Sequence, residues 1–144
     1  LIMFGIFGSL KLGLVAILPN TFPMLTVFGL MGWLDFNLDI TTLMTAPIII
    51  GIAVDDTIHF ITHYRLSLLK GASISEAIHS TLHEVGQAII ITTLILMSIF
   101  LFFIPVSHVG VSRFSILAVI AVFSALLADL FLLPALCRVL RVRV

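Results

Sequence analysis

Residues 40–61 decide the fold, and their sequence is ITTLMTAPIIIGIAVDDTIHFI. The run is mostly apolar and long enough for a helix that crosses a membrane, which takes roughly 20 residues. Inside it lie the adjacent Asp55 and Asp56, with Gly51 one helical turn before them and His59 one turn after. Ionisable side chains at this depth are costly and are typical of functional sites. The stretch therefore predicts a membrane-spanning helix with an acidic pair near the bilayer midplane.

The whole chain has the composition of an integral membrane protein. Of its 144 residues, 61% are hydrophobic and 10% are charged, and the mean hydropathy is +1.32. The sequence contains no basic run that would bind nucleic acid, so that class of partner is excluded. The single Cys137 forms neither an intrachain disulfide nor a cysteine metal site, and we expect it to pack among apolar side chains.

Hydropathy predicts an all-α, polytopic bundle with about five transmembrane spans. Helices are expected because the backbone must satisfy its own hydrogen bonds in hydrocarbon. The first span is only about half the length of a crossing, so we expect a fragment that begins within a truncated helix. The spans are predicted at residues 1–10, 12–33, 40–61, 88–106 and 114–133.

The charges of the loops predict the orientation of these spans. Alternating crossings place Arg113 on one side of the membrane, together with Asp35 and Asp39. Because Lys and Arg accumulate on the cytoplasmic side, the opposite side is predicted to be cytoplasmic, with the C-terminus there. The protein is thus expected to be a multi-pass protein of the cytoplasmic membrane. The cytoplasmic cations would be Lys11, Arg65, Lys70, Arg138, Arg141 and Arg143.

A polar stretch at residues 73–85 predicts one amphipathic helix on the cytoplasmic membrane surface. Ser73 and Glu76 have the spacing of a capping box and follow the helix breaker Gly71. His79 and His83 lie on the polar face, where solvated histidines are more common than pH sensors. The apolar face comprises Ile74, Ala77, Ile78, Leu82 and Val85.

Two further features interrupt the apolar spans. Pro19 and Pro23 flank Asn20 and predict a kink, which is either structural or a broken helix at a substrate or gating position. Asp129 precedes Pro134 near the end of the last span. We expect Asp129 to anchor the helix at the cytoplasmic interface, by reaching toward water or pairing with a cation.

Helix geometry aligns the acidic pair with two histidines. Gly51, Asp55, His59 and His63 form one i, i+4 row that runs toward the cytoplasmic side, and Asp56 flanks it. Gly51 would let another helix approach the carboxylates closely. Adjacent buried carboxyl groups can hold and release a proton, and histidines titrate near neutral pH. A proton relay is favoured over a packing role for one protonated aspartate, and over a metal site made by the carboxylates and His59.

Residues 51–59, Gly-Ile-Ala-Val-Asp-Asp-Thr-Ile-His, resemble the G-x-x-x-D-D helix of the resistance-nodulation-division superfamily, particularly its MMPL and sterol-sensing-domain-like exporters. The resemblance covers the chain as five helices of one six-helix repeat. Other motifs follow the family's order: Pro-Asn-Thr-Phe-Pro at 19–23, Glu-Ala-Ile at 76–78, Thr92-Thr93, and the segment 129–134.

The resemblance implies a proton-driven secondary transporter, not an enzyme, that exports lipids or hydrophobic compounds without a cofactor. Asp55 and Asp56 would bind the proton, and Thr92 and Thr93 would present hydroxyls to them. Bonding of those hydroxyls to their own helix is an equal alternative. Partners would be a second transmembrane repeat, extracytoplasmic domains and membrane lipids, with further copies of the protein as an open alternative. The basic residues 138–144 favour the second repeat over the first.

Two other classes of protein compete with the exporter. A lipid- or sterol-sensing membrane module would share the fold but bind without pumping. An intramembrane aspartyl protease would need a second aspartate at the same depth on another helix, and Asp129 is expected too near the cytoplasmic face. No Lys or Arg lies within the predicted spans, so a cationic or tyrosine partner for the acids is expected from the other repeat.

Overall fold

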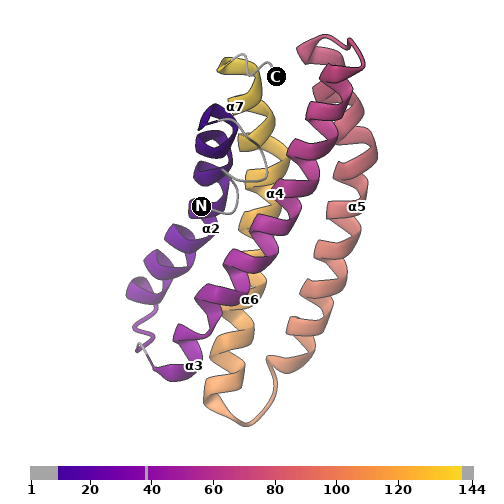
Figure 1. Cartoon of the computed structure of the whole chain (residues 1–144). Coiled ribbons are helices and arrows are strands. Elements are labelled where there is room, and N and C mark those ends of the chain that lie inside the picture. Colours follow the sequence, from indigo (N-terminus) through magenta and orange to yellow (C-terminus); the bar gives the residue numbers. More distant parts are fainter. Residues whose placement is uncertain (1–9, 38, 141–144) are drawn as a thin grey trace.

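A computed structural model describes residues 10–37 and 39–140 of the chain. Every element of this part is helical, which confirms the predicted all-α fold (Figure 1). Four helical segments are long and apolar enough to cross a membrane. The predicted first span, residues 1–10, lies outside the described residues except for Leu10. The elements are α2 (Leu10–Trp33), α3 (Ile40–Leu43), α4 (Thr45–Leu69), α5 (Ile74–Phe103), α6 (Val109–Leu127), η1 (Ala128–Leu132) and α7 (Leu133–Val139).

The predicted span at 40–61 is wrong in both boundaries. A short α3 precedes α4, because Asp39 and Thr42 form a capping box: the Asp39 carboxylate accepts from the Thr42 N–H at 2.7 Å. The chain turns at Met44, and α4 then continues to Leu69. This longer α4 places Asp55 and its neighbour near the middle of the helix.

The predicted amphipathic helix and the span after it form one continuous helix, α5. The capping box at its start is as predicted: Ser73 accepts from the Glu76 N–H, and the Glu76 carboxylate accepts from the Ser73 N–H. Gly86 does not end the helix, since a single glycine costs only about 1 kcal/mol there. Its small size brings α5 close to η1, where an added Cβ would lie 3.4 Å from Leu130. Ala77 and its neighbours pack in the protein core and not on a separate interfacial helix.

The last span also differs from its predicted bounds, because α6, η1 and α7 form one segment from Val109 to Val139. The η1 segment is a π-helical turn in which the Leu133 N–H donates to the Ala128 carbonyl. Pro134 explains it physically: proline has no N–H for the carbonyl of Leu130 and its ring clashes with that group. The wider turn accommodates the proline without ending the helix.

Helix α2 passes through Pro19 and Pro23 without interruption. Its two halves run in different directions in Figure 1, in agreement with the predicted kink. Asn20, between the prolines, donates its side-chain N–H to the Ala16 carbonyl at 2.7 Å. This bond satisfies a backbone acceptor inside the bent part of the helix.

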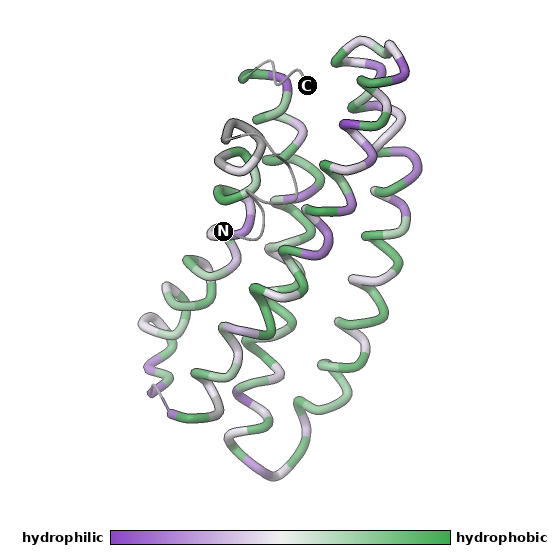
Figure 2. Tube along the Cα trace, in the orientation of Figure 1, coloured by the Kyte–Doolittle hydropathy of each residue, from purple (hydrophilic) through white to green (hydrophobic). Residues whose placement is uncertain are grey.

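The helices form a bundle in which α4 lies between α2 and α5, and α6 packs behind them (Figure 1). One buried cluster joins α2, α4, α5 and α7, and includes Tyr64 and the free thiol of Cys137, which is buried as predicted. The α4–α5 connection and α7 lie at one end of the bundle, and the α5–α6 loop lies at the other. Figure 2 shows that hydrophilic residues gather at the α4–α5 end, while the helices are hydrophobic over most of their length.

Candidate proton-binding site

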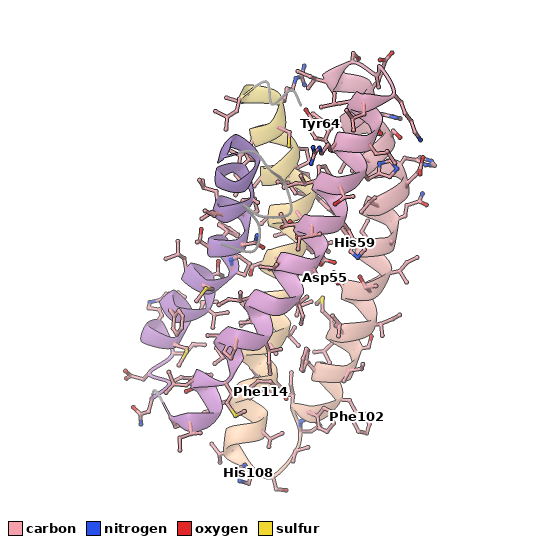
Figure 3. All side chains as sticks on the ribbon, in the orientation of Figure 1. Asp55, His59, Tyr64, Phe102, His108 and Phe114 are labelled. Atoms are coloured by element: carbon pink, nitrogen blue, oxygen red, sulfur yellow. The ribbon has the colours of Figure 1, made fainter. Side chains whose placement is uncertain are left out.

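The structure places Asp55 and His59 in succession along α4, on its side toward α5 (Figure 3). The Asp55 Oδ1 lies 3.6 Å from the His59 Nε2, and their side chains are 74% and 68% exposed in this chain. Asp56 is half-buried. The two neighbouring carboxyl groups therefore occupy different environments, one open and one partly enclosed by the bundle.

An open groove of about 350 Å³ between α4 and α5 brings together four of the predicted site residues of α4. A second hollow of about 340 Å³ extends along Asp55 and Asp56 in the direction of Leu96. The two hollows share Asp55, Asp56 and Thr92. The first groove is lined by Asp55, Asp56, His59, His63, Glu84, Val85, Ala88, Ile89 and Thr92.

His63 connects the acidic row to α5 through both ring nitrogens. Its Nδ1 lies 3.1 Å from the Thr81 Oγ1, and its Nε2 lies 3.0 Å from the Glu84 Oε2. The Thr81 hydroxyl donates to the Ala77 carbonyl at 2.7 Å, so Thr81 is left to accept from His63. The Glu84 carboxylate also accepts. With an acceptor at each nitrogen, a doubly protonated His63 ring would donate to both partners and form an ion pair with Glu84.

Sequence reasoning missed Thr81 and Glu84 as partners of His63. Both lie on the predicted amphipathic segment, three residues apart and therefore on one helical face. That spacing predicts a polar stripe along the helix. It does not show which other helix packs against the stripe.

Thr92 and Thr93, the two threonines of the predicted site, face different surroundings. Thr92 lines both hollows beside Asp55 and Asp56. Its hydroxyl, however, donates to the carbonyls of Ala88 and Ile89 in its own helix, at 3.1 and 3.0 Å. Thr93 is 2% exposed and belongs to the buried side of α5. Thr92 thus borders the acidic groove while its hydroxyl is used within α5.

Gly51 continues the acidic row on an open surface. A Cβ built at this position would meet nothing within 4 Å in the described part of the chain. The space that glycine leaves beside the carboxylates is therefore not filled by the helices described here. Close approach of another helix at Gly51 stays a prediction.

Asp129 is not at the interface, and the expectation that it anchors the helix there is wrong. It is 1% exposed, and its Oδ1 lies 2.8 Å from the Thr57 Oγ1. The Thr57 Oγ1 also lies 3.2 Å from the Asn20 Oδ1. The span was expected to end just beyond Asp129. Instead, the helix continues through η1 into α7, and the Asp129 carboxyl lies inside the bundle. Thr57 and Asn20 were missed as its partners, although Thr57 directly follows Asp56.

The described residues contain no group of three or more His, Cys, Asp or Glu side chains placed to hold a metal ion. The metal alternative therefore gains no support from the geometry of the acidic row.

Four membrane-length helices and a row of ionisable groups along one of them define a multi-pass helical membrane domain. The model of the Patched family, described as the Patched SSD, matches residues 6–139. The chain belongs to this family of sterol-sensing-domain-like proteins within the resistance-nodulation-division superfamily, as its motifs predicted.

Relatives of this chain include named transporters. The chain is 30% identical over 102 residues to the hopanoid transporter HpnN of Burkholderia multivorans, an alignment that covers 71% of this chain and 12% of the transporter. It is 26% identical over 144 aligned positions to the solvent-resistant pump membrane transporter SrpB of Pseudomonas putida, covering 95% of this chain and 13% of the pump. A putative membrane protein of Methanocaldococcus jannaschii is 32% identical over 80 residues, covering 56% of this chain and 21% of that protein.

The chain therefore spans about an eighth to a fifth of the length of these relatives. No solved structure matches the chain significantly.

Proposed function

We propose that this domain is part of a proton-coupled exporter of lipids or other hydrophobic compounds, with Asp55 and Asp56 as its proton-binding pair. The single observation that carries the proposal is the acidic groove. Two adjacent carboxyl groups lie at the middle of a membrane-length helix, next to a line of groups that can exchange protons. Such groups within a membrane are costly, and proton pathways of pumps use them.

The order of these groups supports a route for the proton along α4. Asp55 contacts His59, and His63, one turn further, pairs with Glu84 at the α4–α5 end of the bundle. A proton released from the aspartates would move through the two histidines to Glu84 and then to water. By the charge asymmetry of the loops, that end faces the cytoplasm.

The open side of the acidic row supports a role for the rest of the protein. Asp55 is too exposed in this chain to remain against lipid, and Gly51 leaves space beside it. A second transmembrane repeat would cover this surface and supply a partner for the carboxylates, and extracytoplasmic domains would select the substrate. The transporter relatives, which are far longer than this chain, are consistent with such further domains.

The test uses the full-length protein in cells, with efflux of the hydrophobic dye Nile red as the readout. Asp55→Asn and Asp56→Asn keep the size of each side chain but cannot carry the proton. We expect each variant to reach normal expression and to reduce energy-dependent efflux to the background seen with a protonophore.

Asp35→Asn is the matched control, because it makes the same chemical change at an exposed position outside the long helices. Asp35 has a φ of 53°, a conformation that asparagine tolerates well. Efflux at the wild-type rate in both Asp55→Asn and Asp56→Asn would refute proton coupling by this pair.

A sterol- or lipid-sensing module is the second candidate, and one observation favours it. A wholly apolar groove of about 430 Å³ lies between Phe22 of α2 and the segment around η1, and its chemistry suits a lipid tail. Its lining residues are Phe22, Leu127, Ala128, Phe131, Leu132 and Ala135. Specific binding of a photoreactive sterol by the full-length protein, with no protonophore-sensitive efflux, would favour this function over export.

A further inference from the structure

Asp129 takes part in a buried polar contact that the acidic groove does not use. Three segments meet there: Asn20 comes from α2, Thr57 from α4 and Asp129 from η1. All three residues are buried, at 8%, 0% and 1% exposure respectively. The Thr57 Oγ1 lies 2.8 Å from the Asp129 Oδ1 and 3.2 Å from the Asn20 Oδ1.

The number of available protons decides the chemistry of this contact. The Asn20 side-chain nitrogen donates to the Ala16 carbonyl, which fixes its oxygen as the atom that faces Thr57. Thr57 then faces two oxygen acceptors, but its hydroxyl has a single proton. If Asp129 is ionised, one of the two oxygen pairs has no proton between its members.

A proton on Asp129 resolves the shortage. The Asp129 Oδ1–H would donate to the Thr57 Oγ1, and the Thr57 hydroxyl would donate to the Asn20 Oδ1. The Asn20 amide already donates to Ala16. Each contact then has its own donor, and the hydrogen bonds run in one direction from η1 through α4 to α2.

Burial also favours the protonated form of Asp129. In the described part of the chain its second oxygen, Oδ2, is buried without a hydrogen-bond partner. A buried carboxylate with one hydrogen bond is far more costly than a neutral carboxylic acid, whose Oδ2 is only a carbonyl oxygen. The Thr57 Oγ1 already lies at hydrogen-bonding distance from both of the other oxygens, so a proton fits between them without movement of the side chains.

We propose that Asp129 is a second proton-binding site of this domain, occupied in the conformation described here, and that its proton completes the hydrogen-bond chain that joins η1, α4 and α2. When the proton leaves, the Thr57 hydroxyl turns to the Asp129 carboxylate and gives up Asn20. The contact between α4 and the bent part of α2 then loses a hydrogen bond.

The charged groups around Asp129 are few. The ionisable residue of α2 is Lys11, nine positions before Asn20. On α4, Asp56 directly precedes Thr57, and Arg65 lies about two turns beyond Thr57. Within α6 the ionisable residue is Arg113, which is 16 positions away at the far end of the segment, and on α7 Cys137 and Arg138 lie two or more turns beyond.

Two features connect the site to movement of the helices. Asp56 lines the acidic groove, and Thr57, the next residue of α4, contacts Asp129. A change in the charge of Asp56 therefore occurs one residue away from the hydrogen bond to Asp129. Asp129 lies in a π-helical turn, and such turns are rare and frequent at functional sites. The site is thus placed to link protonation with the packing of η1.

The test is infrared difference spectroscopy on the purified full-length protein at neutral pH. We expect the C=O stretching band of a protonated carboxyl group, shifted by exchange into D₂O, in the wild type and not in Asp129→Asn. The band should persist in the Asp55→Asn, Asp56→Asn double variant, which is the control for the acidic groove. Identical carboxyl bands in wild type and Asp129→Asn would overturn the proposal.

Thr57 provides a second pair of variants in case Asp129→Asn does not fold. Thr57→Val removes the hydroxyl with little change of shape and should shift the band, whereas Thr57→Ser keeps the hydroxyl and should leave it in place. An unshifted band in Thr57→Val would contradict the hydrogen bond. Carboxylate bands that respond to replacing Na⁺ by K⁺ would instead identify a sodium site and overturn the assignment of a proton.

This inference extends the proposed function but is tested separately from it. If Asp55→Asn and Asp56→Asn leave Nile red efflux unchanged, the export proposal fails, while the infrared band still decides the state of Asp129.

Discussion

At the scale of single residues, the adjacent aspartates differ in what surrounds them. The Asp55 side chain is open and paired with His59, whereas Asp56 is half-buried beside α5. Asp56 directly precedes Thr57, which contacts Asp129, whereas Asp55 begins the row that continues to His59 and His63. The pair therefore offers one carboxyl group toward the proposed exit route and one toward the bundle interior.

His59 is the residue that best separates a relay from simple packing. Its imidazole can hold a proton transiently, whereas glutamine forms hydrogen bonds but does not titrate. We expect His59→Gln to slow efflux by less than the roughly hundredfold loss that removal of an essential proton carrier causes, and to shift its pH dependence. Water and His63 would still provide a path.

The measurement is Nile red efflux from cells over a series of external pH values. His79→Gln is the control, because His79 is exposed on α5 and does not line the groove beside the aspartates. A pH profile identical to that of the wild type would reduce His59 to a packing residue.

Individual site residues were predictable where the helical repeat alone places them. The row of Asp55, His59 and His63 follows from i, i+4 spacing within one helix, and the structure has these residues along one groove. Contacts between helices were not predictable in this way. The sequence cannot show which residue of α5 faces His63, or that Asp129 faces Thr57, because both depend on how the helices rotate about their axes.

At the scale of elements, the sequence indicated that helices exist but misplaced their ends. Capping signals were reliable: the Ser73 box starts α5, and the chain turns at Gly71 as expected for a breaker. The apolar pattern was less reliable, because the difference in composition between the two halves of α5 led to the prediction of two separate helices. A change of surroundings along one helix changes composition without ending the helix.

The end of α4 depends on Gly71, which has a φ of 90°. The Gly71 N–H donates to the Leu68 carbonyl at 3.0 Å and the Ala72 N–H to the Ser67 carbonyl at 3.2 Å, the pattern of a Schellman motif. An L-residue in this conformation is strained, so we expect Gly71→Ala to destabilise the fold by about 1 kcal/mol. Thermal unfolding of the purified protein in detergent measures the loss.

Gly29→Ala is the matched control for this change. Gly29 lies inside α2 with open space at its Cβ position, so alanine should leave the melting temperature equal or slightly higher. If both variants melt at the same temperature, the left-handed turn does not contribute as argued.

At the scale of the whole molecule, segments that were predicted to lie on the same side of the membrane lie at the same end of the bundle. The α4–α5 connection and α7 share one end of the bundle, and the α5–α6 loop lies at the other (Figure 1). The cations predicted to be cytoplasmic within the described residues, including Arg65 and Arg138, belong to the first end. Which side of the membrane that end faces stays a prediction from charge alone.

Single cysteines in a full-length background free of other cysteines test this orientation. A thiol at position 75 should react with a membrane-impermeant maleimide only from the cytoplasmic side, and one at position 37 only from outside. Both Ser75 and Asn37 are exposed, so the maleimide can reach a cysteine at either position from the side of the membrane on which it lies. Labelling of both positions from one side would overturn the assignment.

The π-helical turn at Ala128–Leu132 also sets the rotational phase of everything after it. One residue turns an α-helix by about 100°, and a π turn accommodates an additional residue without moving the axis aside. Leu133 and Cys137, both 0% exposed, point into the bundle because that residue is present. Loss of one codon within the turn would rotate α7 and bring other side chains inward, so the inner face of the C-terminal helix depends on a single additional residue.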